Sequence, residues 1–126
     1  MKKALLLSLI VLFFSSIQAQ SNTQLFDDIS DSFRKNDDKL LSNNFAQTLD
    51  LTIGETDGTY SKQHASVLIK KFFTDHYISS FTIKHQGSSN NKTHYAVCYL
   101  KSNDKRWRVY ILLDNHSKII QLQIEE

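Results

Sequence analysis

The second half of the chain alternates hydrophobic and polar residues with a period of two, a pattern that predicts β-strands. Short polar loops such as Ser102-Asn103-Asp104 separate the alternating segments. Loops this short join neighbouring antiparallel strands. We therefore predict a four-stranded antiparallel meander, with strands at residues 79–87, 92–101, 105–113 and 118–125.

The first half of the chain combines helical spacing with one strand. Apolar residues three and four positions apart predict a helix over residues 22–36 and a short one over 39–45. Residues 46–53 alternate as a half-buried strand does, and Gly54 to Gly58 predict a turn. Ser61 is then expected to cap a third helix, whose apolar face includes Phe72.

Centring each turn of the meander in its loop predicts three strand registers, and all three gather apolar side chains on one face. The helices should cover that face, which includes Ile120. The opposite face mixes tyrosine, arginine and other residues, among them Lys84, Val97, Leu112 and Ile119. The facing pairs predicted are Phe81 with Cys98, His85 with His94, Leu100 with Trp107, Ile111 with Ile120, and Arg106 with Glu125.

The first 19 residues have the pattern of a signal peptide. Lys2 and Lys3 precede an apolar run from Ala4 to Phe14, which is short of the roughly 20 residues that span a bilayer. Ala19 suits the position before a cleavage site, and Gln20 is the expected mature N-terminus. An uncleaved membrane anchor is the alternative. We predict a protein exported to the periplasm or secreted, with no membrane contact after cleavage.

Residues 20–126 have the size and composition of one folded domain. The chain is 40% hydrophobic and 22% charged, with a single cysteine, Cys98, that leaves no internal disulfide. Without Lys2 and Lys3, 13 basic residues remain against 13 acidic ones, so the formal net charge is zero. This balance lacks the basic excess of a nucleic-acid-binding protein, and we expect no nucleic-acid partner.

The order of elements resembles the nuclear-transport-factor-2-like α+β cone, in which N-terminal helices pack on a curved antiparallel sheet. Three stretches are similar to a bacterial family of exported proteins known as domain of unknown function 4783. They are Gly58-Thr59-Tyr60-Ser61-Lys62 leading into Phe72-Phe73, His85-Gln86-Gly87-Ser88-Ser89, and Arg108-Val109-Tyr110-Ile111-Leu112-Leu113. The resemblance implies a cone with a pocket between helices and sheet, and it supplies no catalytic residue.

The chain lacks the motifs of several chemistries. No Asp or Glu occupies an inward strand position from Phe81 to Ile124, where a buried base would be needed. No Gly-x-Ser-x-Gly motif occurs, and Cys98 lies on the apolar face, where a thiol behaves as a small hydrophobe. We therefore predict no catalytic residue, no metal ligand and no cofactor, and we favour a non-catalytic role.

Two surfaces are candidates for binding. The apolar pocket of the cone would take a small hydrophobic ligand, with Tyr60, Phe72, His85, His94 and Trp107 as candidate lining residues. The mixed face would bind a partner or a second copy, because tyrosine and arginine are enriched at interfaces and many cone proteins pair through their sheets. Its candidate residues are Tyr95, Tyr99, Arg106, Arg108 and Tyr110. The alternative function is a small-molecule enzyme or metal-binding protein using His85 and His94 at the pocket mouth.

Overall fold

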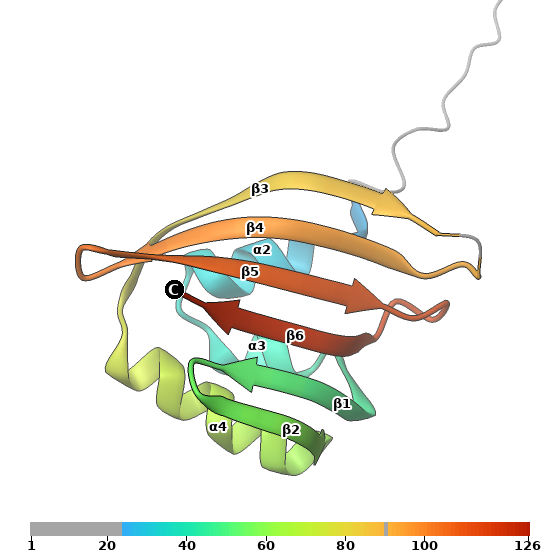
Figure 1. The fold of residues 1–126 in the computed structure, drawn as a ribbon, viewed down its shortest axis with the longest axis horizontal. Coiled ribbons are helices and arrows are strands. Elements are labelled where there is room, and N and C mark those ends of the chain that lie inside the picture. The colour runs from blue at the N-terminus through green and yellow to red at the C-terminus, as the bar shows by residue number, and fades with distance from the viewer. Residues whose placement is uncertain (1–23, 90) are drawn as a thin grey trace, which may run out of the picture.

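Helices cover one face of a curved six-stranded sheet in the computed structural model, which describes residues 24–89 and 91–126 (Figure 1). The predicted signal peptide lies outside the described residues. The elements are α2 (Asp27–Arg34), α3 (Asp38–Ser42), β1 (Phe45–Ile53), β2 (Thr56–Ser61), α4 (Lys62–Asp75), β3 (Ile78–Ser88), β4 (His94–Ser102), β5 (Lys105–Leu113) and β6 (Ile119–Glu125).

The sheet has the strand order β2-β1-β6-β5-β4-β3. The predicted meander is present as β3 to β6, with antiparallel neighbours throughout. The β1–β2 hairpin extends it, and β1 runs parallel to β6. The sheet is therefore mixed and larger than the alternation alone predicts.

The turn predicted over residues 54–58 is shorter in the structure, because residues 56–58 belong to strand β2. The reversal needs only the residues around Gly54, whose φ of +58° is the left-handed conformation that glycine adopts readily. Asp57 is already in the strand, opposite Thr52, whose hydroxyl donates to the Asp57 carboxylate at 2.8 Å. The Asp-Gly dipeptide, a common turn sequence, here lies inside a strand because a cross-strand partner holds it.

The helix signals are confirmed, and the first two helices are shorter than predicted. The Ser61 hydroxyl accepts from the His64 N–H at 3.1 Å and caps α4, as expected. Asp37 caps α3 in the same way. That helix ends at Ser42, and Phe45 belongs to β1. In α2, Phe33 packs inward and its ring stacks on Phe81 of β3 with 4.5 Å between centroids.

The β4–β5 register agrees with the prediction, while the β3–β4 register does not. Leu100 faces Trp107 as expected, but Phe81 also faces Leu100 instead of Cys98. The β3–β4 loop is centred on residue 91, and a β-bulge between Ile83 and His85 adds one residue to β3. Bulge and longer loop together shift the pairing.

The β5–β6 register is also shifted by two residues from the prediction. Ile111 faces Leu122 instead of Ile120, and Arg108, not Arg106, faces Glu125. A bulge between Leu112 and Leu113 then pairs Leu113 with Ile119. As a result, Ile119 is buried in the core and Ile120 is partly exposed, the reverse of the predicted assignment.

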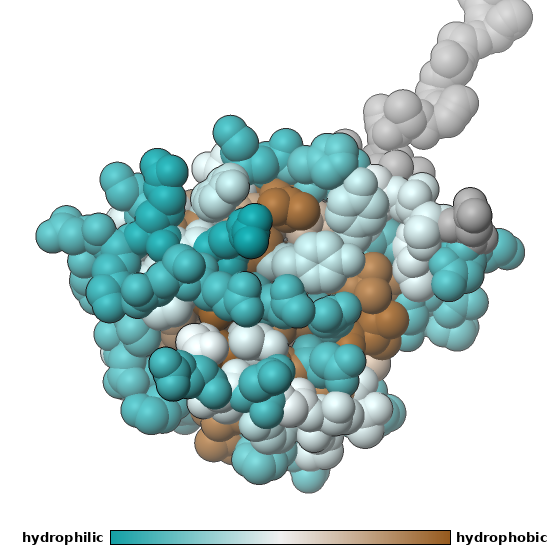
Figure 2. Space-filling model, viewed as in Figure 1, coloured by the Kyte–Doolittle hydropathy of each residue, from teal (hydrophilic) through white to brown (hydrophobic). Residues whose placement is uncertain are grey.

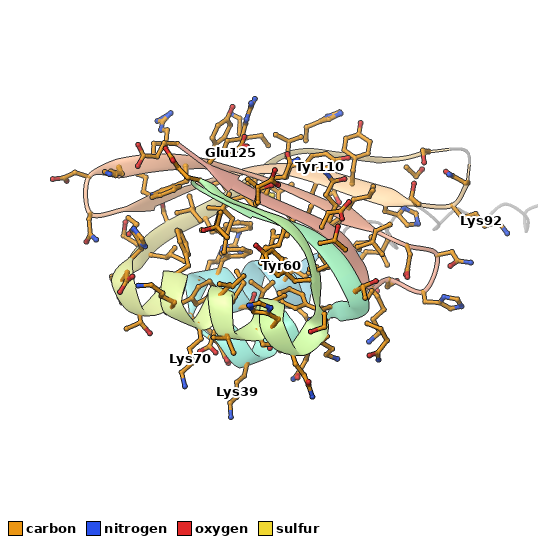
Figure 3. All side chains as sticks on the ribbon, turned by 60° about the horizontal axis from the view of Figure 1, so that its bottom comes forward. Lys39, Tyr60, Lys70, Lys92, Tyr110 and Glu125 are labelled. Atoms are coloured by element: carbon orange, nitrogen blue, oxygen red, sulfur yellow. The ribbon has the colours of Figure 1, made fainter. Side chains whose placement is uncertain are left out.

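The core fills the layer between the sheet's inner face and the helices. Viewed along the sheet, the helices lie beneath it and Tyr60 points into the space between β2 and α4 (Figure 3). The alternating inner residues of β4 and β5, from Ala96 to Leu100 and from Trp107 to Leu113, are buried. The protein's own side chains therefore cover the apolar face of the sheet.

Candidate binding surface

The outer face of the sheet, away from the helices, carries the side chains of the predicted interface. Alternate residues of β4 and β5 form facing pairs there: Tyr95 with Leu112, Val97 with Tyr110, and Tyr99 with Arg108. Tyr110 and Glu125 project from this face in Figure 3. The strand pleat thus brings the five predicted residues, Tyr95, Tyr99, Arg106, Arg108 and Tyr110, onto one surface.

One end of this face is uncharged. We call the group formed by Tyr95, Val97, Tyr110 and Leu112 the apolar end; all four side chains are partly exposed. The Tyr95 and Tyr110 rings stack with centroids 6.4 Å apart. Hydrophobic side chains gather where β5 ends and β6 begins, in the right half of the view in Figure 2. The four side chains adjoin one another, because the register pairs Tyr95 with Leu112 and Val97 with Tyr110.

Two neighbours on β3 fix the orientation of Tyr95. Its hydroxyl and the His85 Nε2 share a hydrogen bond at 2.8 Å. Its ring covers Gly87, where an added Cβ would lie 2.9 Å from the Tyr95 hydroxyl oxygen. An aromatic side chain over an edge-strand glycine fills the space that a missing side chain leaves. Tyr95 is consequently held flat on the sheet.

The other end of the face carries four cationic side chains, with Glu125 opposite Arg108 and Glu126 beside the arginines. The Arg106 guanidinium carbon lies 6.0 Å from the centre of the Tyr99 ring, within the range of a cation–π contact. Lys101 is opposite Arg106 in the β4–β5 register. Two hollows open here, of about 460 Å³ between β3, β4 and β5 and about 250 Å³ around Arg106 and Arg108. We call this region, with Lys84, Tyr99, Lys101, Arg106 and Arg108, the cationic end.

The predicted pocket residues do not form one site. Phe72 and Trp107 are in contact, with ring centroids 5.2 Å apart, and His76 stacks on Phe72. Tyr60 packs edge-on against His64 on α4. His94 lies opposite Leu113, at the far end of the β4–β5 ladder from Trp107. The set is split among separate places in the fold.

The two histidines are not cross-strand neighbours, which corrects the prediction. His85 pairs with Val97 and is exposed on the outer face, whereas His94 pairs with Ser88 and buries its Nδ1. The bulge before His85 reverses its side-chain direction relative to the pattern. No group of three metal-ligating side chains occurs within residues 24–89 and 91–126.

A small hollow of about 130 Å³ lies beside the Phe72–His76 stack, between α4 and the end of β1. Sequence reasoning missed His76 as part of this aromatic group. Its signal is the four-residue spacing from Phe72, which places both on one side of the helix end. The Lys71 amine donates to the Asp75 carboxylate at 2.8 Å on the rim and lowers the pKa of Asp75.

Sequence reasoning also left Ser80 and Lys101 out of the outer-face candidates, although both line the larger hollow. Strand parity could have found them, because Lys101 is two residues from Tyr99 and Ser80 two from Thr82.

The fold belongs to the nuclear-transport-factor-2-like α+β cone class, as its helices on a curved sheet indicate. A designed protein described as Rd1NTF2_04 with long sheet superposes with a TM-score of 0.67 at 14% identity, covering 82% of this chain and 99% of that one. Within this class, the profile described as Domain of unknown function (DUF4783) matches residues 26–125. The chain belongs to this family.

Crystal structures of DUF4783 family proteins have the same fold. The protein from Bacteroides ovatus is 21% identical, with a TM-score of 0.72 over 79% of this chain and 93% of its own. The one from Bacteroides uniformis is also 21% identical, with a TM-score of 0.74 over 79% and 94%. A search of curated proteins finds no match. In the described residues, no helix has the length and apolar character needed to cross a membrane.

Proposed function

We propose that the protein is a non-catalytic interaction module that binds through the outer face of its sheet, and that its partner is a second copy of the chain. The observation that carries this proposal is the apolar end: two stacked tyrosines with Val97 and Leu112, partly exposed and without a charge among them. Contiguous apolar patches of this kind are typical of interaction sites.

The surroundings of the apolar end support a protein interface. Gln121 and Gln123 of β6 lie beside it, opposite Leu112 and Tyr110, and supply a polar rim. An apolar centre with aromatic residues and a polar rim is the usual anatomy of such surfaces. A second copy presents the same patch, so a two-fold arrangement would bury both at once. The formal net charge of zero for residues 20–126 adds no long-range repulsion between copies.

A small hydrophobic ligand inside the cone has weaker support. Inner-face residues such as Trp107, Val109 and Ile111 are already buried by the protein itself. The hollow beside Phe72 is small, about 130 Å³, against the roughly 300–1,000 Å³ of ligand pockets. The outer face is therefore the surface that we assign to a partner.

Sedimentation velocity over a concentration series tests self-association. We expect the wild-type protein to form a dimer and Tyr110→Glu to weaken it at least about tenfold, because a charge would be buried at the patch. The matched control is Val67→Glu, since Val67 is 64% exposed on α4, which packs against the other face of the sheet. A monomer at every concentration, or a dimer equally stable in Tyr110→Glu, contradicts the proposal.

We also propose that the protein is exported and loses residues 1–19. The support is the lysine pair and short apolar run before Ala19. An intact mass of the protein from a periplasmic or secreted fraction should correspond to a chain beginning at Gln20. A full-length chain that stays with the membrane fraction would show an uncleaved anchor instead.

A further inference from the structure

We propose that the cationic end holds a binding site for a small anionic sugar, a ring with hydroxyl groups and one carboxylate. The site is the hollow of about 460 Å³ on the outer face between β3, β4 and β5. This inference goes beyond self-association and does not depend on it. The side chains that would make the site are Ser80, Thr82, Lys84, Tyr99, Lys101 and Arg106.

The charged residues that line this hollow are all cations. Lys84, Lys101 and Arg106 line it, and no carboxylate does. The ion pairs among the described residues are Lys71 with Asp75 and Lys105 with Glu126. The three lining cations therefore have no described carboxylate within 4.0 Å. Lys101 and Arg106 are directly opposite each other on adjacent strands, so their charges repel, and a bound anion would relieve that repulsion.

The strand registers fix the relative positions of these side chains. Thr82 faces Tyr99, and Ser80 faces Lys101, which in turn faces Arg106. Five of the six side chains thus come from two adjacent cross-strand rows, and the sixth, Lys84, lies next to the bulge of β3. Groups mounted on paired strands hold their spacing better than groups on loops.

The uncharged groups determine the class of anion. Ser80 and Thr82 offer hydroxyls that can both donate to and accept from ligand hydroxyls. Tyr99 is partly buried and gives the hollow an aromatic wall, against which the faces of sugar rings can pack. A volume of about 460 Å³ lies within the range for small-ligand sites, roughly 300–1,000 Å³. Charge, hydroxyls and one aromatic wall together match an acidic sugar better than a bare inorganic anion.

The site is separate from the apolar end. Tyr95 and Leu112 pair near the β3–β4 loop, whereas Lys101 and Arg106 pair beside the β4–β5 turn, at the opposite ends of the same strands. In Figure 2 the left part of the face is hydrophilic and the hydrophobic side chains lie to its right.

Isothermal titration of glucuronate into the purified protein at low salt tests the proposal. We expect saturable binding by the wild type and at least about tenfold weaker binding by Arg106→Gln, since a charge-assisted hydrogen bond contributes about that much. Lys70→Gln is the control, because Lys70 is exposed on α4 and points away from the sheet (Figure 3). Glucose, which has the ring without the charge, should not bind.

Four results would overturn the assignment: no saturable binding of glucuronate, unchanged binding by Arg106→Gln, equal weakening by Lys70→Gln, or equal affinity for glucose. Inorganic sulfate is the last probe. If sulfate binds as tightly as glucuronate, the hollow recognises charge alone and the sugar assignment is wrong. Far-ultraviolet circular dichroism of each variant checks that the fold is kept, so that lost binding reports on the site.

Discussion

At the scale of single residues, Cys98 shows how burial sets chemistry. It lies in the middle of β4 on the inner face and is fully buried. Burial raises the pKa of its thiol from an ordinary value of 9.0 to about 12, because the thiolate would lose its hydration in the core. The positive charge of Arg34 opposes this shift only in part. The thiol is therefore protonated and unreactive in the folded protein.

We predict that Cys98 reacts with a thiol reagent only after unfolding. At about pH 8 the native protein should be modified far more slowly than the protein in denaturant, because the thiolate is the reactive form. Mass spectrometry of the adduct over time measures both rates. Comparable rates in the two conditions would place the thiol at the surface.

The same shift makes alkaline pH destabilising. Above the unfolded pKa, near 9.0, the unfolded chain loses the thiol proton while the folded chain keeps it up to about 12. The contribution of this thiol to the free energy of unfolding is therefore complete below pH 9.0 and is lost as the pH rises toward about 12.

At the scale of elements, loop geometry decides which registers the sequence could predict. The β4–β5 turn has two residues, Asn103 and Asp104, between the paired Ser102 and Lys105. Their φ values of 50° and 72° are those of the tight hairpin turn that Asn and Asp favour. With no bulge in this hairpin, centring the turn predicted its register correctly.

The β5–β6 hairpin shows why the other registers were missed. Asp114 closes a longer loop: its carboxylate accepts from the N–H groups of His116 and Lys118. A bulge follows, and Ile119 takes the core position. Neither feature changes the pattern of apolar residues, because Ile119 and Ile120 are the same residue type. Alternation therefore cannot choose between them.

Ile119 and Ile120 give a matched test of the β5–β6 register. Ile119→Ala should lower the free energy of unfolding by about 2–5 kcal/mol, because it leaves a cavity in the core. Ile120→Ala removes the same atoms from a partly exposed site and should cost less than about 1 kcal/mol. Urea unfolding of both variants measures the difference. A larger loss for Ile120→Ala would restore the register that simple alternation predicts.

At the scale of the whole molecule, the parallel contact between β1 and β6 was out of reach of local patterns. Leu51 lies beside Leu122, and Ile53 beside Ile124, although most of the chain separates them. Both strands are visibly amphipathic, but alternation does not say which strands meet. The family resemblance implied the cone, and the six-stranded order came from the structure.

The outer face could be predicted in part for a simple reason. Strand parity assigns a side chain to a face, and the β4–β5 pair has no bulge and the predicted register, so Tyr99, Arg106 and Tyr110 were placed on the correct face. Parity failed where a bulge intervened, as it did for His85. The predicted pocket residues lie in separate places because the sequence pattern does not show which of them are buried together, as Phe72 and Trp107 are, and which are exposed, as His85 is.

We propose that the molecule binds its partner through the outer face of its sheet. Hydroxyl-radical footprinting across a range of protein concentrations tests this proposal most directly, with mass spectrometry reading each tyrosine. Tyr77 is the internal control, because it is 69% exposed and lies between α4 and β3, away from the apolar end. We predict that modification of Tyr95 and Tyr110 falls as the concentration rises, while that of Tyr77 stays constant. Concentration-independent modification of all three tyrosines, or protection of Tyr77 alone, would contradict the account.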